Sequence, residues 1–214
     1  MKKILFVAAV ALAAVSIRAE ADGYIMLSVC SPGQLPAPSY TIHGGRLSFI
    51  YGECRELYGL DISMSGYVRE RMYGAQLGFI LNYVDIGAGY QSGFANFVEH
   101  EFYGFQDGAW NHAADGCGMQ NGVVNTAGYF AGYQDAGAIN WADEMDGFQA
   151  AGLWNHAGIG YGMQLGFVNT AGYFAGFQWG VFNWANDLDG LQLGLVNVVA
   201  NQPVPVLPFI NIGF

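Results

Sequence analysis

Two histidines occur in the same four-residue phrase, and histidine is both a common metal ligand and an acid–base group. The phrase Trp-Asn-His-Ala stands at residues 110–113 and again at 154–157, which places His112 and His156 44 residues apart. Two ligands of one zinc ion lie within a few ångströms of each other. The repeat described below separates these histidines by three coils, about 14 Å. Duplicated surface histidines therefore explain them better than a shared metal ion does.

Acidic side chains gather in short segments that offer some of the oxygen atoms that calcium binds. Residues 143–146 and 187–189 are such segments, and His100 lies between Glu99 and Glu101. A calcium site needs about six to eight oxygen ligands. These segments lack the spacing and the closing glutamate of an EF-hand loop. We interpret them as solvated turns, and the sequence predicts neither a metal ion nor a cofactor.

Residues for covalent catalysis are sparse along the chain. No serine follows Ser92, and neither a Gly-x-Ser-x-Gly motif nor a papain-like cysteine motif occurs. No lysine follows Lys3, so the remaining chain cannot form a phosphate-binding loop of the Gly-x-x-x-x-Gly-Lys-Ser/Thr type. The sequence predicts a protein that is not an enzyme.

The most regular chemistry in the chain is that of side-chain amides, which both donate and accept hydrogen bonds. The phrase Gly-x-Gln-x-Gly-x-x-Asn occurs at residues 162–169, 176–183 and 190–197, and its amides recur upstream in steps of 14 or 15 residues. The glutamines are Gln76, Gln91, Gln106, Gln120, Gln134, Gln149, Gln164, Gln178 and Gln192. The asparagines are Asn82, Asn96, Asn111, Asn125, Asn140, Asn155, Asn169, Asn183 and Asn197. We expect these two sets to form structural ladders in a repeat architecture.

Degenerate copies extend the repeat at both ends. Asp61 and Arg46 stand 15 and 30 residues before Gln76, where a glutamine would be, and residues 208–211 follow residues 194–197 by 14. The total is about twelve copies, and degenerate outer copies are typical of caps that close a stack. The predicted organisation has four parts. They are residues 1–21 as a signal peptide, 22–43 as an N-terminal cap, 44–202 as the repeat domain and 203–214 as a C-terminal cap.

Each copy alternates apolar residues with amides or glycines. Leu191, Leu193 and Leu195 point to one side of the chain, while Gln192 and the glycines beside it point to the other. A period of two predicts strands. Glycine at every fourth position would also cost a helix about 1 kcal/mol each. The sequence therefore predicts an all-β protein.

Two all-β architectures use such strands. In a parallel β-solenoid each repeat is one coil, whereas in an antiparallel outer-membrane β-barrel each repeat is one membrane-spanning strand. Residues 124–132 return as 168–176, and this shift of three repeats would reverse the chain direction in a barrel but not in a solenoid. The solenoid is the favoured fold class. The barrel stays open because 53% of the residues are apolar, 11% are charged and the chain ends in Phe214.

The solenoid gives the repeated phrase a physical reason. Equivalent residues of adjacent coils lie about 4.8 Å apart and form columns. Glutamine or asparagine columns can bond amide to amide along the stack, and asparagine suits a corner. We expect the alternate apolar column to fill the narrow core. The Gly/Gln side would then be a flat, uncharged surface on which a partner could dock.

The N-terminal segment and the charge indicate export. Lys2 and Lys3, an apolar run and the Ala-Glu-Ala sequence at 19–21 predict a cleaved secretory signal. Its removal leaves four basic and sixteen acidic residues, a formal charge of −12. Nucleic acids and anionic lipids are bound through lysine and arginine, so both are excluded as partners. In an oxidising compartment Cys30 and Cys54 either pair or remain as two free thiols.

The whole series resembles the bacterial Gly-x-Gln-x-Gly-x-x-Asn surface-repeat family. Ten copies run from Asp61 to Asn197, preceded by Leu-Ser-Phe-Ile-Tyr-Gly at 47–52 and followed by Leu-Pro-Phe-Ile-Asn-Ile-Gly-Phe at 207–214. The resemblance covers residues 44–214. It implies a repeat protein at the cell surface or in the outer membrane, and it offers no catalytic residues.

We therefore expect an exported surface protein of the cell envelope with a structural, adhesive or partner-docking role. Its partner and oligomeric state are left open by the sequence, as is membrane association. One alternative is a small outer-membrane barrel that acts as a pore or stabiliser. A weaker alternative is a carbohydrate-binding module that uses the tryptophans Trp110, Trp141, Trp154, Trp179 and Trp184.

Overall fold

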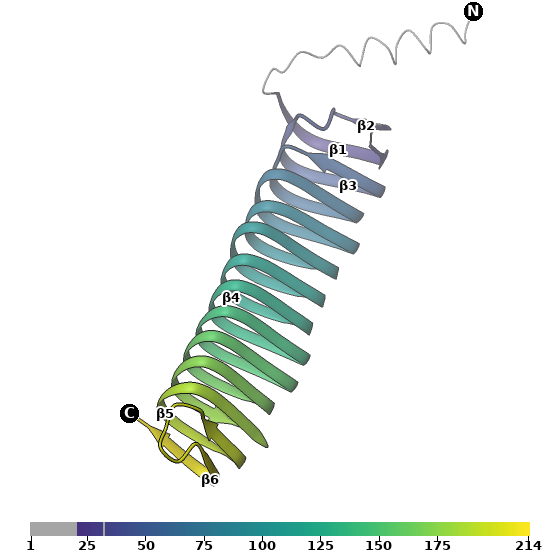
Figure 1. The fold of residues 1–214 in the computed structure, drawn as a ribbon. Coiled ribbons are helices and arrows are strands. Elements are labelled where there is room, and N and C mark those ends of the chain that lie inside the picture. Colours follow the sequence, from purple (N-terminus) through teal and green to yellow (C-terminus); the bar gives the residue numbers. More distant parts are fainter. Residues whose placement is uncertain (1–20, 32) are drawn as a thin grey trace, which may run out of the picture.

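A computed structural model describes residues 21–31 and 33–214 (Figure 1). The strands are β1 (Asp22–Cys30), β2 (Gly33–Leu35), β3 (Thr41–Cys54), β4 (Glu56–Trp179), β5 (Phe182–Val199) and β6 (Val206–Gly213). They form one sheet in the order β2-β1-β3-β4-β5-β6. The predicted signal peptide, apart from its last residue, lies outside the described residues. Within the described part of the chain, no helix is long and apolar enough to cross a membrane.

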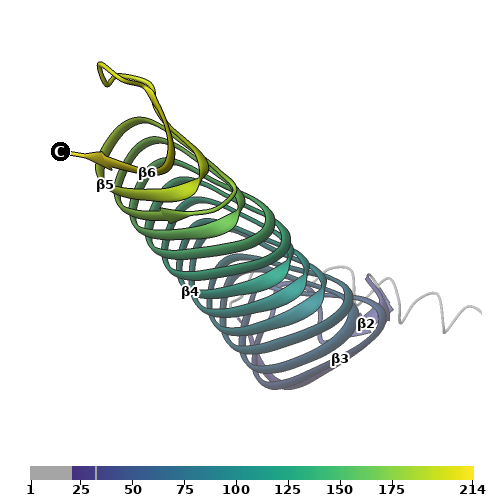
Figure 2. The same ribbon diagram turned by 90° about the horizontal axis from the view of Figure 1, so that it is seen from below.

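The strands pair in parallel at an offset of one coil. Gly44 of β3 pairs with Gly59 of β4, and Gln178 of β4 pairs with Gln192 of β5. The 124 residues of β4 wind as successive coils stacked on one another (Figure 1, Figure 2). The prediction of a parallel β-solenoid, the favoured of the two architectures, is confirmed.

The first glycine of each copy makes a turn that no other residue can make. Eleven such glycines, from Gly44 to Gly190, have a positive φ. At Gly132 φ is 134°, and a Cβ would lie 2.1 Å from the carbonyl oxygen of Gly118 in the preceding coil. Both the φ angle and the close approach exclude a side chain. Eleven turns correspond to about eleven coils, one fewer than expected.

The repeat glutamines form a continuous ladder inside the solenoid. Each glutamine after Gln76 donates a side-chain amide hydrogen to the glutamine one coil earlier, as Gln91 Nε2 does to Gln76 Oε1 over 2.8 Å. Eight such bonds of 2.7–2.9 Å join all nine glutamines. Every one of the nine is fully buried. The amides satisfy each other, so they can be buried without leaving polar groups unpaired along the ladder.

The repeat asparagines form a second buried ladder. Asn82 Nδ2 donates to Asn96 Oδ1 over 2.8 Å, and this is the first of eight bonds of 2.8–3.0 Å that join the nine asparagines up to Asn197. The same amide nitrogen also reaches a backbone carbonyl of the next coil, as Asn111 Nδ2 does to that of Asn121 over 2.7 Å. Asparagine suits this bend because its short amide reaches both partners.

The side of each strand that faces inward is the opposite of the one that we expected. Gln192 is fully buried, whereas Leu195 is exposed. The predictions that the apolar column fills the core and that the Gly/Gln side forms the docking surface are therefore wrong. The interior is narrow, since a Cβ on Gly166 would lie 2.7 Å from Asn155 Nδ2. Only glycine, alanine and amides that bond along the stack fit there, and leucines at those positions would not.

Small and aromatic residues fill the rest of the interior. Buried alanines stand two residues after the asparagines at 127, 142, 157, 171 and 185. In a neighbouring column, Gly116 lies one coil before Phe130, and Gly160 lies one coil before Phe174. A Cβ on either glycine would lie 2.6 Å from the Cδ2 atom of that phenylalanine. Each glycine makes room for the ring of the next coil, which keeps the core at close-packed density.

A buried ion pair continues the glutamine column toward the N-terminus. Arg46 pairs with Asp61 in register, and its Nε and Nη2 atoms lie 2.8 and 2.5 Å from the carboxylate oxygens. Both side chains are fully buried. Burial lowers the pKa of Arg46, but the hydrogen bond and charge of Asp61 outweigh it, and the pKa is raised overall. The two charges compensate each other at the end of the ladder.

The N-terminal cap consists of β1, which pairs in parallel with β3, and β2, which folds back antiparallel on β1. Cys30, Cys54 and Cys117 are free cysteines, so the two thiols at 30 and 54 are unpaired here and the disulfide is not formed. Arg46 Nη1 donates to the Cys54 sulfur over 3.1 Å. Burial raises the pKa of the Cys54 thiol to about 11.

The C-terminal end does not add a further coil. Residues 208–211 were expected to be a last parallel rung, but β6 runs antiparallel to β5, with Asn211 opposite Gln192. The chain reverses through residues 200–205, which include Pro203 and Pro205. Pro208 within β6 lacks a donor N–H, so it suits an edge strand and opposes further pairing. The prediction of a parallel rung is wrong, and the reversal closes the stack instead.

Candidate functional site

One side of the solenoid carries rows of exposed apolar side chains. They are the outward residues between each ladder glutamine and the asparagine that follows it, with the equivalent residues of 46–52 and 61–66; we call this surface the apolar face. Its exposed members are Leu47, Phe49, Ile50, Ile62, Met64, Leu77, Phe79, Ile80, Phe94, Trp110, Val123, Leu153, Phe167, Trp179, Val181, Leu195 and Val196. Phe79 is 79% exposed, Phe94 67% and Trp179 60%. Contiguous apolar patches of this kind mark interaction surfaces.

The other side of each coil carries most of the charge. The segments between each asparagine and the next glutamine hold Asp85, Glu99, Glu101, Asp115, Asp143, Glu144, Asp146, Asp187 and Asp189. On the apolar face, among the residues that the structure describes, only Asp107 and Asp135 are charged and outward. The solenoid is therefore amphipathic in the coils that hold these residues, whereas the segments 126–133, 156–163 and 170–177 contain no acidic residue.

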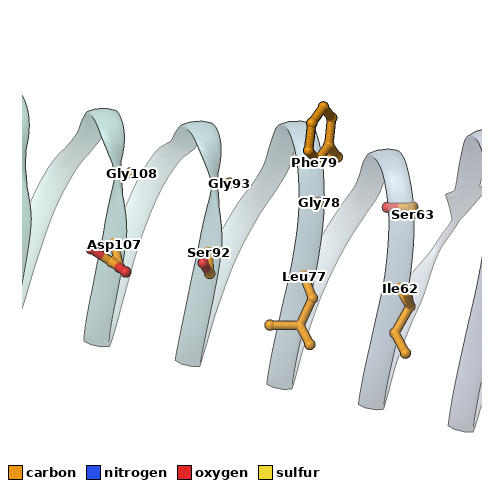
Figure 3. A pocket seen from close by; sticks show the side chains of 9 residues that line it. All are labelled: Ile62, Ser63, Leu77, Gly78, Phe79, Ser92, Gly93, Asp107 and Gly108. Atoms are coloured by element: carbon orange, nitrogen blue, oxygen red, sulfur yellow. The ribbon is translucent and has the colours of Figure 1, made fainter.

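A shallow groove of about 540 Å³ runs over the apolar face near its N-terminal end (Figure 3). Gly78, Gly93 and Gly108 form its floor, because their side-chain positions point inward toward the asparagine ladder. Figure 3 shows Ile62 and Leu77 along one margin and Phe79 standing at the other. The stacked columns thus form parallel ridges with a trough between them.

The apolar face also contains a polar stretch. The column that follows the glutamines holds Ser92, Asp107, Asn121 and Asp135 in four successive coils. Asn121 Nδ2 donates to Asp107 Oδ1 over 2.9 Å, so two of these side chains are joined across neighbouring coils. The face is therefore apolar at both ends and partly polar in the middle.

No family model, curated protein or solved structure matches this chain. The role of the apolar face is therefore inferred from its own residues.

The two Trp-Asn-His phrases form equivalent clusters with the threonine of the next coil. His156 Nδ1 lies 2.9 Å from Thr170 Oγ1, and Trp154 Nε1 donates to the same oxygen over 2.8 Å. The ring of Trp141 lies 4.0 Å from that of His156. His112 makes the matching contact with Thr126, also at 2.9 Å. These polar atoms bond the neighbouring coil, so the clusters stabilise the stack.

Burial lowers the pKa of both His112 and His156, with Asp143 partly opposing the shift at His156. His100, by contrast, is exposed and hydrogen-bonded to Asp85, and this bond raises its pKa. In the described residues no group of three or more His, Cys, Asp or Glu side chains could hold a metal ion. The histidines and acidic turns are thus distributed along the stack and do not converge on one point.

The glutamines and asparagines predicted as structural ladders all lie in the interior, where a binding partner cannot contact them. Sequence reasoning missed the apolar face, because it assigned those columns to the core. The charge gave a usable signal, since nine of the eleven acidic residues from Gln76 to Asn197 fall between an asparagine and the next glutamine. That asymmetry leaves Asp107 and Asp135 as the only charged residues in the Gln-to-Asn segments from Gln76 to Asn197.

Proposed function

We propose that this chain is an exported, non-catalytic repeat protein of the bacterial surface or outer membrane, whose apolar face docks onto an envelope partner. The observation that carries the proposal is the row of exposed apolar side chains that spans the stack from Leu47 to Val196. Burying such side chains stabilises a complex by removing them from water. The predicted signal peptide and the resemblance to surface-repeat proteins support the location.

The continuous ladders support a structural role. Each coil is tied to its neighbours by two buried amide bonds in addition to the parallel backbone pairing. A stack of this kind holds its outward side chains in straight columns, so it presents a pre-organised surface at little entropic cost on binding.

Cell fractionation with matched variants tests the proposal. Phe79→Asp and Phe167→Asp place a charge on the apolar face, whereas Tyr103→Asp and Tyr161→Asp change exposed aromatics on the acidic side. We expect the wild type and both tyrosine variants to stay with the envelope fraction through a wash at physiological salt and pH. The phenylalanine variants should be released several-fold more. Equal retention of all five proteins, or protein confined to the cytoplasm, would contradict the proposal.

A further inference from the structure

The size of the apolar face matches that of a stable protein interface. The face follows about eleven coils, counted by their turn glycines. Coils spaced by about 4.8 Å and strands of about six residues give a surface of roughly 50 by 20 Å. That is about 1,000 Å², against about 800 Å² that each partner contributes to a standard-size interface. The face is large enough to hold one protein partner along its whole length.

The polar stretch of the face favours protein over lipid as the occupant. Asp107 and Asp135 point outward in the middle of the face, and a carboxylate is costly to place in hydrocarbon. Protein interfaces accept such groups because they hold hydrogen bonds and trapped water. The absence of an outward lysine or arginine on this face, within the described residues, also removes the attraction for anionic headgroups.

The distribution of charge permits a second copy to approach. The chain is strongly acidic, but nine acidic residues on the other side of the coils point away from the apolar face. Two copies packed face to face therefore bring four carboxylates to the interface, Asp107 and Asp135 of each copy. When two copies pack face to face, their acidic sides stay on the outside, in water.

The shape of the face is self-complementary. Phe79 and Phe94 project from one ridge, and the glycine-floored groove of about 540 Å³ lies beside that ridge. In a two-fold dimer every contact occurs twice, with the same patch on both copies. The phenylalanine ridge of each copy can therefore lie in the groove of the other.

We propose that the apolar face binds a second copy of this chain, in a face-to-face two-fold dimer. This inference rests on the proposed function, because it names the occupant of the same docking surface. The envelope partner would then bind the dimer, or it would compete with the second copy for the apolar face. The prediction is a homodimer that forms without detergent or lipid.

Sedimentation velocity over a range of micromolar concentrations tests this. The mature wild-type chain should have twice its monomer mass, and Phe79→Asp and Phe167→Asp should each weaken dimerisation by about 30-fold or more. Tyr103→Asp and Tyr161→Asp should leave it unchanged. Far-UV circular dichroism of each variant establishes that the solenoid is folded, and the second phenylalanine variant serves if the first does not fold.

A monomeric wild type, or face variants that dimerise as well as the controls, would overturn the proposal. Vesicles of zwitterionic phosphatidylcholine then separate two cases. If the monomer binds them and Phe79→Asp does not, a lipid surface is the occupant and the docking function stands. If neither protein binds and envelope retention is equal as well, the docking function fails together with the dimer.

Discussion

Asn111 donates its side-chain amide to Asn125 in the following coil, over 2.9 Å. In the same two coils, Gln120 donates in the reverse direction, to Gln106 over 2.7 Å. The two ladders keep these opposite directions along the stack, so their side-chain dipoles oppose one another. The ends agree with this arrangement, because Gln76 Nε2 and Gln192 Oε1 have no hydrogen-bond partner.

A central rung should matter more than an end rung. Gln120→Met keeps the size of the side chain but leaves Gln106 Oε1 and Gln134 Nε2 unpaired. We expect a loss of about 2–5 kcal/mol in the free energy of unfolding, because each buried unpaired group costs about 1–3 kcal/mol. Gln76→Met strands only Gln91 Nε2 and should cost half as much or less. Urea titrations followed by circular dichroism measure both, and equal losses would contradict the ladder argument.

The ladder shows what the sequence could and could not predict. The steps of 14 or 15 residues between glutamines such as Gln76 and Gln91 specify stacked, equivalent coils. The alternation around Gln192 specifies a strand, but a period of two is the same whether leucines or glutamines face inward. The inward side depends on the width of the coil, which the spacing does not reveal. Because the sequence analysis placed the apolar residues inside, it also missed the groove that lies on the apolar face.

The turn glycines provide a test of backbone conformation. Gly132→Ala would place a methyl group 2.1 Å from a carbonyl oxygen and force an alanine to a φ of 134°. We expect a destabilisation of roughly 3 kcal/mol or more. Gly137→Ala is the matched control, since the nearest atom to its Cβ is 3.8 Å away. It should be neutral or slightly stabilising in the same thermal melts. A tolerated Gly132→Ala would show that the turn can relax.

The pairing of large and small core residues predicts a non-additive double variant. Gly116→Ala brings a methyl group against the ring of Phe130, and Phe130→Leu removes part of that ring. Each change alone should destabilise the protein. The double variant should be more stable than the sum of the two by about 1–3 kcal/mol, because the smaller leucine leaves room for the methyl group. A double-mutant cycle in urea measures this coupling, and strict additivity would refute it.

The buried ion pair at the N-terminal end should tolerate replacement of both charges by amides but not the loss of one charge alone. Asp61→Asn leaves the buried Arg46 guanidinium without its countercharge, and we expect a loss of about 3–5 kcal/mol. The double variant Arg46→Gln with Asp61→Gln would instead extend the glutamine ladder by two rungs. Its free energy of unfolding should return to within about 1 kcal/mol of the wild type. If the double variant is less stable than Asp61→Asn, the column does not accept amides at this end.

The two cluster histidines predict a loss of stability in mild acid. Burial lowers the pKa of His112 and His156, so below their ordinary value of about 6.5 the unfolded chain binds more protons than the folded chain. The free energy of unfolding should therefore decrease as the pH falls through about 6.5, and it should be flat above that value. The double variant His112→Gln with His156→Gln should remove this decrease.

His100 supplies a control of opposite sign. Its bond to Asp85 raises its pKa, so its contribution is present below the ordinary value and is lost as the pH rises through the folded value. His100→Gln should consequently make the acid decrease steeper, while the double cluster variant makes it shallower. Urea midpoints measured at closely spaced pH values distinguish the two. An unchanged slope in the double variant would mean that these histidines do not set the acid sensitivity of the solenoid.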